Sequence, residues 1–548
     1  MSDSVQTNDP ADGRLTARAL ALPDVTPLDS FRRTATRLPG SPFLHYFGTT
    51  LTFSEADAIS DAMAAGLLAS GVRVGDRVGL FLQNDPDFAI AQLATWKVGG
   101  VCVSINPMLR AQELQHILVD SGATALVVLK NLWDDVASEI VAATVVRTVF
   151  LTNRTDWEAG SREVRIPRLV GGTRVQLLQS VIRAHSGAAV GPSAATIDDV
   201  ALICYTSGTS GRQKGVAASH RNVAYSAAVY QSWMSIDEHD VFLCGAPIFH
   251  VTGLVAGLAL SYRSGMSMVL FHRFDAAVCL EQIERHRPTF TIMATTAFQA
   301  LLHHPDSATR SLRSLTKVYS GGAPVTSAID RQWFELSGSG IRNVYGLTET
   351  TGPTHATPLA GLPRLDPESG AMAIGLPLPG VEARLVDVAS GAVVPAGQQG
   401  ELWVKGPMVM REYWNLPDAT AEAFKDGFFR TGDIGKKDSD GWFYIIDRLK
   451  DMINASGYKV WPREVEDYLL QHPDILEVAV VGIPDSYRGE SVKAFVVLRN
   501  GSILTPGEII AFAKMHMAAY KYPRCVEVVG DLPKTASGKV LRRELRTR

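Results

Sequence analysis

The sequence has few cysteines, and none of them lies in a spacing typical of metal binding or redox chemistry. Five occur in 548 residues, without a CxxC motif or a Cys/His cluster. This pattern argues against a disulfide framework and a cysteine zinc site, and it predicts a reducing compartment such as the cytoplasm. Cys204 and Cys244 lie in apolar runs and are expected to be buried structural thiols.

The sequence also lacks an excess of charge of one sign and a targeting signal. Lysine and arginine number 53 against 56 aspartate and glutamate, so nucleic acid is not an indicated partner. Residues 1–15 are polar and are expected to form a disordered tail rather than a leader. Residues 241–262 carry no charged side chain, but Pro247, His250 and three glycines favour a buried strand, a loop and a core helix over a membrane span.

The hydrophobic pattern predicts an α/β fold. Residues 51–129 alternate apolar strands with amphipathic helices, the first of which has Ser54 as its expected N-cap and Gly71 as its stop. Residues 153–195 are expected to be an irregular surface excursion, and 371–404 a β-rich subdomain. The last hundred or so residues predict a small α+β unit, with helices over 463–471 and 508–517.

These patterns predict two domains. A large N-terminal domain of α/β layers, including the β-rich subdomain, is expected over 16–447. A small α+β domain is expected over 448–548, because the charged segment Asp447–Asp451 separates the β-rich pattern before it from the mixed helix and strand pattern after it.

The stretch Tyr205–Gly215, YTSGTSGRQKG, follows an apolar run over 200–204. Glycines let backbone N–H groups approach an anion closely, hydroxyls add donors, and a lysine adds positive charge. A Ser/Gly linker is the alternative, but the preceding strand and the helix that Ser219 can cap favour a phosphate-binding loop. The spacing does not fit the P-loop ATPases. The residues expected to bind phosphate are Thr206, Ser207, Gly208, Thr209, Ser210, Gly211 and Lys214.

This loop resembles that of the AMP-forming adenylating enzymes, which include acyl-CoA synthetases, peptide-synthetase adenylation domains and beetle luciferases. The family has Thr where this chain has Ser210 and Pro where it has Gln213. Further motifs follow in the family's order, so the resemblance covers nearly the whole chain: SGGAP (320–324), YGLTET (345–350), TGD (431–433) and LPKTASGK (532–539). The run DRLKDMINASGYKV (447–460) is most similar to bacterial fatty acyl-CoA synthetases.

The resemblance implies a role for each residue around the nucleotide. Tyr345 would pack on adenine, Thr348 would bond the α-phosphate, and Glu349 would bind Mg²⁺, which prefers oxygen ligands. Asp433 would accept the ribose hydroxyls, with Arg448 near the ribose and phosphate. The other expected nucleotide contacts are Gly321, Gly322, Ala323 and Gly346.

The small domain is implied to be mobile about Lys450 and to carry the catalytic Lys539. A lysine there would neutralise charge as a carboxylate attacks the α-phosphorus of ATP. Lys534 is an alternative for this role. After reorientation, the loop of Ser456, Gly457, Tyr458 and Lys459 would line the path of coenzyme A.

The implied reaction converts an acid and ATP into acyl-AMP and pyrophosphate, and then transfers the acyl group to a thiol. Free coenzyme A is the expected acceptor, because no carrier-protein domain follows Lys539; a separate carrier protein is the alternative. A non-catalytic nucleotide-binding homologue is disfavoured, because Glu349, Asp433 and Lys539 are all present. ATP, Mg²⁺ and coenzyme A are thus the expected ligands, and a monomer and a homodimer both remain open.

The identity of the acid is predicted from the residues expected beside its chain. Val251 and Leu254 would form apolar walls, and His250 would be a gate, although a histidine in an apolar run is as often a core residue. Gly346 stands where acetate-specific relatives have Trp, so it would open the pocket. A medium- or long-chain fatty acid is favoured, and an aryl or branched acid remains open.

Overall fold

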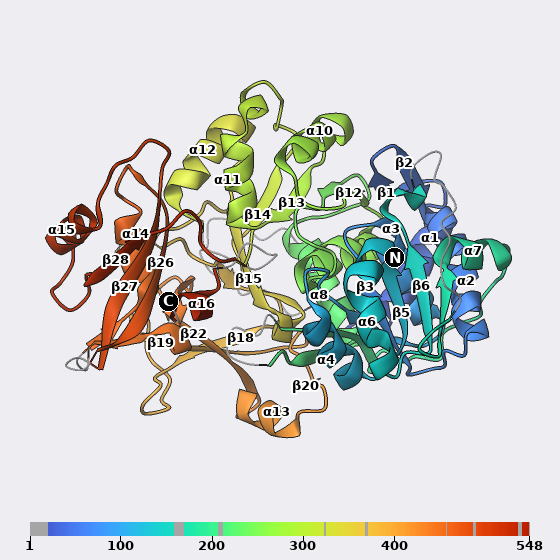
Figure 1. Ribbon diagram of the computed structural model, residues 1–548. Coiled ribbons are helices and arrows are strands. Elements are labelled where there is room, and N and C mark those ends of the chain that lie inside the picture. The colour runs from blue at the N-terminus through green and yellow to red at the C-terminus, as the bar shows by residue number, and fades with distance from the viewer. Residues whose placement is uncertain are drawn as a thin grey trace.

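The computed structural model describes residues 20–157, 169–206, 212–322, 325–367, 371–455, 458–485, 489–534 and 540–546, with only the backbone at 458 and 459. Two large sheets and the helices around them form the N-terminal part of the chain, and a third, smaller sheet follows. The C-terminal unit, orange to red in Figure 1, lies to one side of these layers. The predicted fold class, α/β layers with a β-rich subdomain and a small α+β unit, is confirmed.

The first large sheet is parallel in its central part and antiparallel at its edges. Across the sheet, its strands are β17 (Leu376–Pro377), β16 (Gly352–Ala356), β15 (Arg342–Leu347), β14 (Lys317–Ser320), β13 (Phe290–Met293), β11 (Val241–Leu243), β12 (Ser267–Leu270), β1 (Pro42–Tyr46) and β2 (Thr49–Thr52).

The second large sheet is parallel in its middle, and the hairpin that carries the predicted phosphate loop lies next to one of its edge strands. Across it, the strands are β20 (Glu412–Tyr413), β10 (Gly215–Ser219), β9 (Val200–Tyr205), β4 (Val101–Ser104), β3 (Arg77–Phe81), β5 (Ala123–Leu129), β6 (Thr148–Thr152), β8 (Thr173–Leu177) and β7 (Leu169–Val170). The expectation of an irregular excursion over 153–195 is wrong in part, because β8 extends the sheet and α7 (Leu178–Ala184) packs against a helix. β8 has only two apolar residues in TRVQL, too weak an alternation to reveal a strand.

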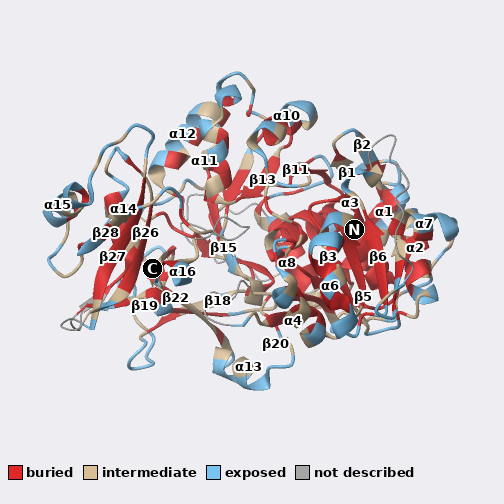
Figure 2. Ribbon diagram, in the orientation of Figure 1, coloured by how far each residue is buried: buried red, intermediate tan, exposed pale blue. Residues whose placement is uncertain are grey.

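Helices fill the space between the two sheets. One hydrophobic cluster joins residues of both sheets to α1 (Pro27–Arg37), α2 (Phe53–Ala69), α3 (Pro86–Lys97), α8 (His220–Trp233), the π-helix η5 (Gly253–Ala259) and α9 (Leu260–Ser264). Every residue of α3 is buried, including Lys97, whose ammonium is paired with Asp57 at 2.6 Å and Asp61 at 2.7 Å. Figure 2 shows this buried interior in red.

The remaining helices of this part lie at the periphery or in connections. They are α4 (Ala111–Ser121), α5 (Lys130–Leu132), η2 (Trp133–Ala137), α6 (Ser138–Ile140), η3 (Val141–Ala143), η4 (Arg154–Trp157), α10 (Ala276–His286), α11 (Thr295–His303), η6 (Pro305–Ala308), α12 (Ser327–Ser337), η7 (Thr348–Thr350) and α13 (Pro417–Ala423).

Two predicted caps have different outcomes. Ser219 caps α8 as expected, and its side chain accepts from the Asn222 N–H. Thr52, not Ser54, caps α2, because its hydroxyl accepts from the Glu55 N–H at 3.2 Å while the Glu55 carboxylate accepts from the Thr52 N–H at 2.8 Å. The uncharged stretch 241–262 forms β11, η5 and α9 in the core, and none of the described helices is long and apolar enough to cross a bilayer.

The third sheet confirms the β-rich subdomain but continues beyond the predicted 371–404. It contains β18 (Glu382–Val386), β19 (Gln399–Lys405), β22 (Phe428–Lys437), β21 (Phe424–Lys425) and β23 (Phe443–Arg448). Because β23 ends at Arg448, this sheet leads directly into the C-terminal unit.

The C-terminal unit has its own sheet and its own hydrophobic core. Its strands are β24 (Ile453–Ala455), β25 (Tyr458–Val460), β26 (Ile475–Asp485), β27 (Gly489–Leu498) and β28 (Cys525–Val528), and its helices are η8 (Leu449–Asp451), α14 (Pro462–Leu469), α15 (Pro506–His516) and α16 (Arg542–Arg546). Both predicted helices are present, each with its proline in the first turn.

Candidate active site

The base of the predicted phosphate loop is held closed. β9 and β10 pair antiparallel, with Tyr205 opposite Gly215. The Thr206 N–H donates to the Lys214 carbonyl at 3.0 Å, and the Lys214 N–H donates to the Thr206 hydroxyl at 3.3 Å. The predicted residues between them, Ser207, Gly208, Thr209, Ser210 and Gly211, lie outside the described residues.

Tyr413 connects the phosphate loop to the predicted Mg²⁺ carboxylate. Its ring faces the Lys214 ammonium at 4.7 Å from the centroid, and its hydroxyl donates to Glu349 Oε1 at 2.8 Å. Burial, and next the charge of Glu349, raise the pKa of Tyr413, so the hydroxyl remains a donor. No sequence motif points to Tyr413, because its contacts are with residues far away in the chain.

The described residues contain no group of three His, Cys, Asp or Glu side chains that could hold a metal ion by itself. Mg²⁺ in nucleotide sites commonly takes one or two carboxylates together with substrate phosphates. Glu349 is half-buried on η7, directly after Thr348. Its backbone is fixed against the segment before β20, because the Met410 N–H donates to the Glu349 carbonyl at 2.7 Å. Glu349 therefore fits a magnesium ion that is shared with bound phosphates.

Tyr345, Asp433 and Arg448, predicted separately as nucleotide contacts, form one connected group. The Tyr345 hydroxyl donates to Asp433 Oδ2 at 2.6 Å, and Arg448 Nε lies 3.1 Å from Asp433 Oδ1. Asp433 and Arg448 are opposite each other in the β22–β23 pair. The charge of Asp433 raises the pKa of Arg448, which remains a cation. Since each carboxylate oxygen has two lone pairs, Asp433 can still accept from ribose hydroxyls.

Glycines at two predicted positions allow a close approach of backbone. A Cβ on Gly321 would lie 3.1 Å from the Val344 carbonyl oxygen, and a Cβ on Gly346 would lie 1.9 Å from the Gly352 carbonyl oxygen. Gly322 has φ +80°, which favours glycine. The backbone packing therefore explains Gly346 independently of pocket size. Ala323 lies outside the described residues.

The predicted acyl-binding residues divide into buried and exposed ones. Val251 and Leu254 are buried in the core between the two sheets, Leu254 on η5. His250 is exposed, so the interpretation of this histidine as a core residue is wrong. Gly346 is exposed on β15. The roles of His250 as a gate and of Val251 and Leu254 as pocket walls remain predictions.

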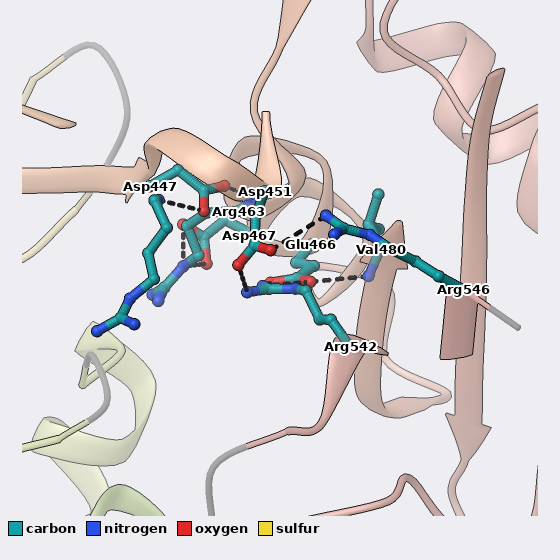
Figure 3. A network of polar contacts seen from close by, with 9 residues as sticks. Asp447, Asp451, Arg463, Glu466, Asp467, Val480, Arg542 and Arg546 are labelled. Carbon is teal, nitrogen blue, oxygen red and sulfur yellow. Dashed lines mark hydrogen bonds and ion pairs between the residues drawn. The ribbon is translucent and has the colours of Figure 1, made fainter. Parts of the chain in front are cut away.

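The predicted hinge is tied to the C-terminal helix by ion pairs. Lys450 lies in η8, and burial, followed by the charge of Arg448, lowers its pKa. Figure 3 shows the network around this segment: Arg542 and Arg546 of α16 pair with Asp451 at 3.4 and 3.1 Å, and Arg542 also pairs with Glu466 of α14 at 2.8 Å.

Asp447 connects the same network to β23 of the third sheet (Figure 3). Its two carboxylate oxygens accept from the N–H groups of Arg448 and Arg463, both at 2.7 Å. Burial raises the pKa of Asp447 to about 6, although the charge of Arg542 opposes this increase. The hinge segment is therefore held on both sides by polar contacts.

The residues predicted for the two reaction steps belong to the C-terminal unit, and most of them lie outside the described residues. Lys539, Ser456 and Gly457 lie outside the described residues, and Tyr458 and Lys459 belong to β25 with only their backbone described. Lys534, the alternative catalytic lysine, is paired with Glu477 at 2.6 Å. This ion pair makes Lys534 the weaker candidate.

Comparison with known proteins identifies the family. The chain matches the family described as "AMP-binding enzyme" over residues 31–414 and the family described as "AMP-binding enzyme C-terminal domain" over 464–539. It is 35% identical to a long-chain-fatty-acid–CoA ligase of Bacillus subtilis, with 96% of this chain and 95% of the relative covered. It is also 34% identical to a feruloyl-CoA synthase of Amycolatopsis, with 94% and 97% covered.

Solved structures give the same result. The anthranilate CoA ligase AuaEII in complex with anthranoyl-AMP has a TM-score of 0.85 at 27% identity, covering 96% of this chain and 98% of that chain. ATP-bound MatB from Rhodopseudomonas palustris has a TM-score of 0.83 at 29% identity, covering 95% and 99%. The chain therefore belongs to the AMP-binding enzyme family.

Proposed function

We propose that the protein is an AMP-forming acyl-CoA synthetase that activates a medium- or long-chain fatty acid. The observation that carries this proposal is the 33–35% identity, over at least 95% of this chain, to several long-chain-fatty-acid–CoA ligases. The apolar side chains of Val251 and Leu254 agree with it, because neither could pair with a polar tail on the acid. A reducing cytoplasm is the proposed compartment, since all five cysteines are free and four of them are buried.

In the first step, a carboxylate oxygen of the acid bonds to the α-phosphorus of ATP and the bond to pyrophosphate breaks. Lys214 and the residues that follow Thr206 in the sequence would hold the phosphates, and Tyr345, Asp433 and Arg448 would hold the nucleoside. Thr348 would bond the α-phosphate. Mg²⁺, when bound by Glu349 and the phosphates, supplies charge neutralisation there.

In the second step, the sulfur of coenzyme A bonds to the acyl carbon and AMP leaves. Lys539 is assigned to the first step, and the segment with Ser456, Gly457, Tyr458 and Lys459 to the second, with reorientation about Lys450 between them. Lys539→Ala is therefore expected to abolish adenylation and to spare thioester formation from supplied acyl-AMP. An equal loss of both half-reactions would contradict this assignment.

An aryl acid is the second candidate substrate. The feruloyl-CoA synthase relative is as similar to this chain, at 34% identity, as the fatty-acid ligases are. The AuaEII structure in complex with anthranoyl-AMP has a similar fold. Gly346 alone does not separate the two classes, because an absent side chain leaves room for a ring as well as for an alkyl chain.

ATP–pyrophosphate exchange tests the proposal directly. The acid panel should run from acetate through butyrate, octanoate and palmitate to benzoate, anthranilate and ferulate. Exchange that depends on octanoate or palmitate is expected, and exchange that depends on ferulate alone would replace the fatty acid by an aryl acid. Adding coenzyme A, or a carrier protein with its phosphopantetheine, then identifies the acceptor. If no acid supports exchange while ATP still binds, the enzyme proposal fails.

A further inference from the structure

Tyr413 is buried although it lies on β20, a short strand at the edge of its sheet. The residue is only 7% exposed, and it packs in a hydrophobic cluster with Val216, Met410 and Phe429. β20 pairs with β10, so Tyr413 lies opposite Val216, two residues after Lys214. The Trp414 N–H donates to the Gly215 carbonyl at 2.7 Å, which fixes β20 against the end of the phosphate loop.

The hydroxyl of Tyr413 is not required for packing in this hydrophobic cluster. A phenylalanine would fill the same apolar space, whereas the tyrosine hydroxyl needs a partner when it is buried. That partner is Glu349 Oε1 at 2.8 Å, the carboxylate assigned to Mg²⁺. Bonding one oxygen restricts the rotation of the carboxylate and leaves the other oxygen for a ligand.

The face of the same ring contacts the phosphate-loop cation. Lys214 Nζ lies 4.7 Å from the ring centroid, within the range of a cation–π interaction. A flexible lysine that rests on a buried ring loses less freedom when it binds phosphate. One rigid side chain therefore contacts both the carboxylate that would bind Mg²⁺ and the ammonium that would bind the phosphates of ATP.

We propose that Tyr413 is a positioning residue that sets the geometry of Glu349 and Lys214 toward magnesium-bound ATP. This inference rests on the proposed function for the roles of those two residues. The hydroxyl and the ring of Tyr413 act differently. The hydroxyl acts through Glu349, so it affects the affinity for ATP only when Mg²⁺ is present. The ring acts through Lys214, so it affects that affinity with or without the metal.

The test is a binding measurement that needs no turnover. The affinity for ATP is measured by titration calorimetry without acid or coenzyme A, once with Mg²⁺ and once with EDTA. Tyr413→Phe is expected to weaken binding of ATP with Mg²⁺ about tenfold, since a hydrogen bond to a charged group is lost. Its binding of ATP in EDTA should stay within about twofold of the unmodified protein. Tyr413→Leu should also weaken binding in EDTA, by about threefold, because the ring is gone.

Tyr444→Phe is the matched control. Tyr444 is 3% exposed and donates to Asp438 Oδ2 at 3.0 Å, so the same atom and the same kind of bond are removed in a different hydrophobic cluster. This variant should bind ATP normally in both conditions. Thermal unfolding of all three variants checks that they are folded.

Two outcomes would overturn the proposal. Tyr413→Phe could bind ATP with Mg²⁺ as tightly as the control does, or it could lose affinity equally with Mg²⁺ and with EDTA, which would indicate a general structural role. Failure of the proposed function is a separate result: no acid would then support pyrophosphate exchange in the unmodified protein, while the binding comparison could still be made.

Discussion

Gly346→Ala distinguishes the two explanations for this glycine. If Gly346 serves only to leave a pocket open, a methyl group should shorten the preferred acid. The structure gives a different expectation, because the added Cβ would lie 1.9 Å from the Gly352 carbonyl oxygen, and real Cβ contacts under 3.0 Å essentially do not occur. β15 and β16 would have to separate locally by about 1 Å, and the clash is with backbone that has no rotamer to change.

The displaced segment carries two residues of the proposed nucleotide site, one on the nucleoside side and one on the phosphate side. Tyr345 precedes Gly346 and bonds Asp433, while Glu349 follows three residues later and bonds Tyr413. Overpacking of this kind typically costs about 1–3 kcal/mol. If that energy is needed to restore the active geometry, pyrophosphate exchange falls about 5- to 150-fold. The loss should be similar for butyrate and palmitate, and the KM for ATP should rise with it.

The assay is pyrophosphate exchange with both acids over a range of ATP concentrations. Gly507→Ala is the control, because no described atom lies within 4 Å of a Cβ added there and no positive φ is present. The backbone explanation is refuted if Gly346→Ala keeps the original rate with butyrate and loses palmitate alone. That result would instead support the pocket hypothesis.

Three further predictions test the hinge network, a buried acid and the ribose site. Arg542→Ala leaves the carboxylate of Glu466, whose side chain is 9% exposed, without its bidentate partner. It should destabilise the C-terminal unit by about 3 kcal/mol in urea unfolding, and an unchanged midpoint would contradict this. Burial raises the pKa of Asp87 from 3.8 to about 7, so the folded protein binds this proton more tightly than the unfolded chain does. The free energy of unfolding therefore falls as the pH rises between these two values, by about 4 kcal/mol in total. Asp87→Asn should remove this fall, and urea midpoints at pH 4 and pH 8 measure it; an equal fall in the variant would refute the assignment to Asp87. Asp433→Asn removes the charge beside Arg448 and should raise the KM for ATP about tenfold, whereas an unchanged KM would exclude Asp433 from the ribose site.

The sequence was sufficient for those parts of the fold that depend on local patterns. The apolar run before the phosphate loop is β9, Ser219 caps α8, and the prolines at 462 and 506 begin α14 and α15. Local competition explains one error: Thr52 and Ser54 are both suitable caps, and the carboxylate of Glu55 three residues after Thr52 decides between them. β8 was missed because its stability comes from pairing with β6, which TRVQL does not encode locally.

The candidate site was predictable only as far as its residues lie in motifs. The motifs supplied Lys214, Tyr345, Glu349, Asp433 and Arg448, but no spacing in the sequence shows that Tyr345 bonds Asp433 across 88 positions. Tyr413 lies outside those motifs and is 64 positions from Glu349. The contact of Tyr413 with Glu349 depends on β20 joining β10 at the edge of a sheet, which is tertiary structure.

The strand and hinge contacts also indicate where the two domains should be divided. We place the point of rotation after Arg448 rather than before it. Arg448 is the last residue of β23, opposite Asp433, so moving it with the small domain would break both the strand pair and the Asp433–Arg448 ion pair at the proposed ribose site. The following segment η8 has no partner strand, and its Asp451 is paired with Arg542 and Arg546 of the small domain. A rotation about Leu449 and Lys450 would therefore keep the proposed nucleoside contacts while it exchanges the loops of the C-terminal unit, as the proposed reaction in two steps on one bound nucleotide requires.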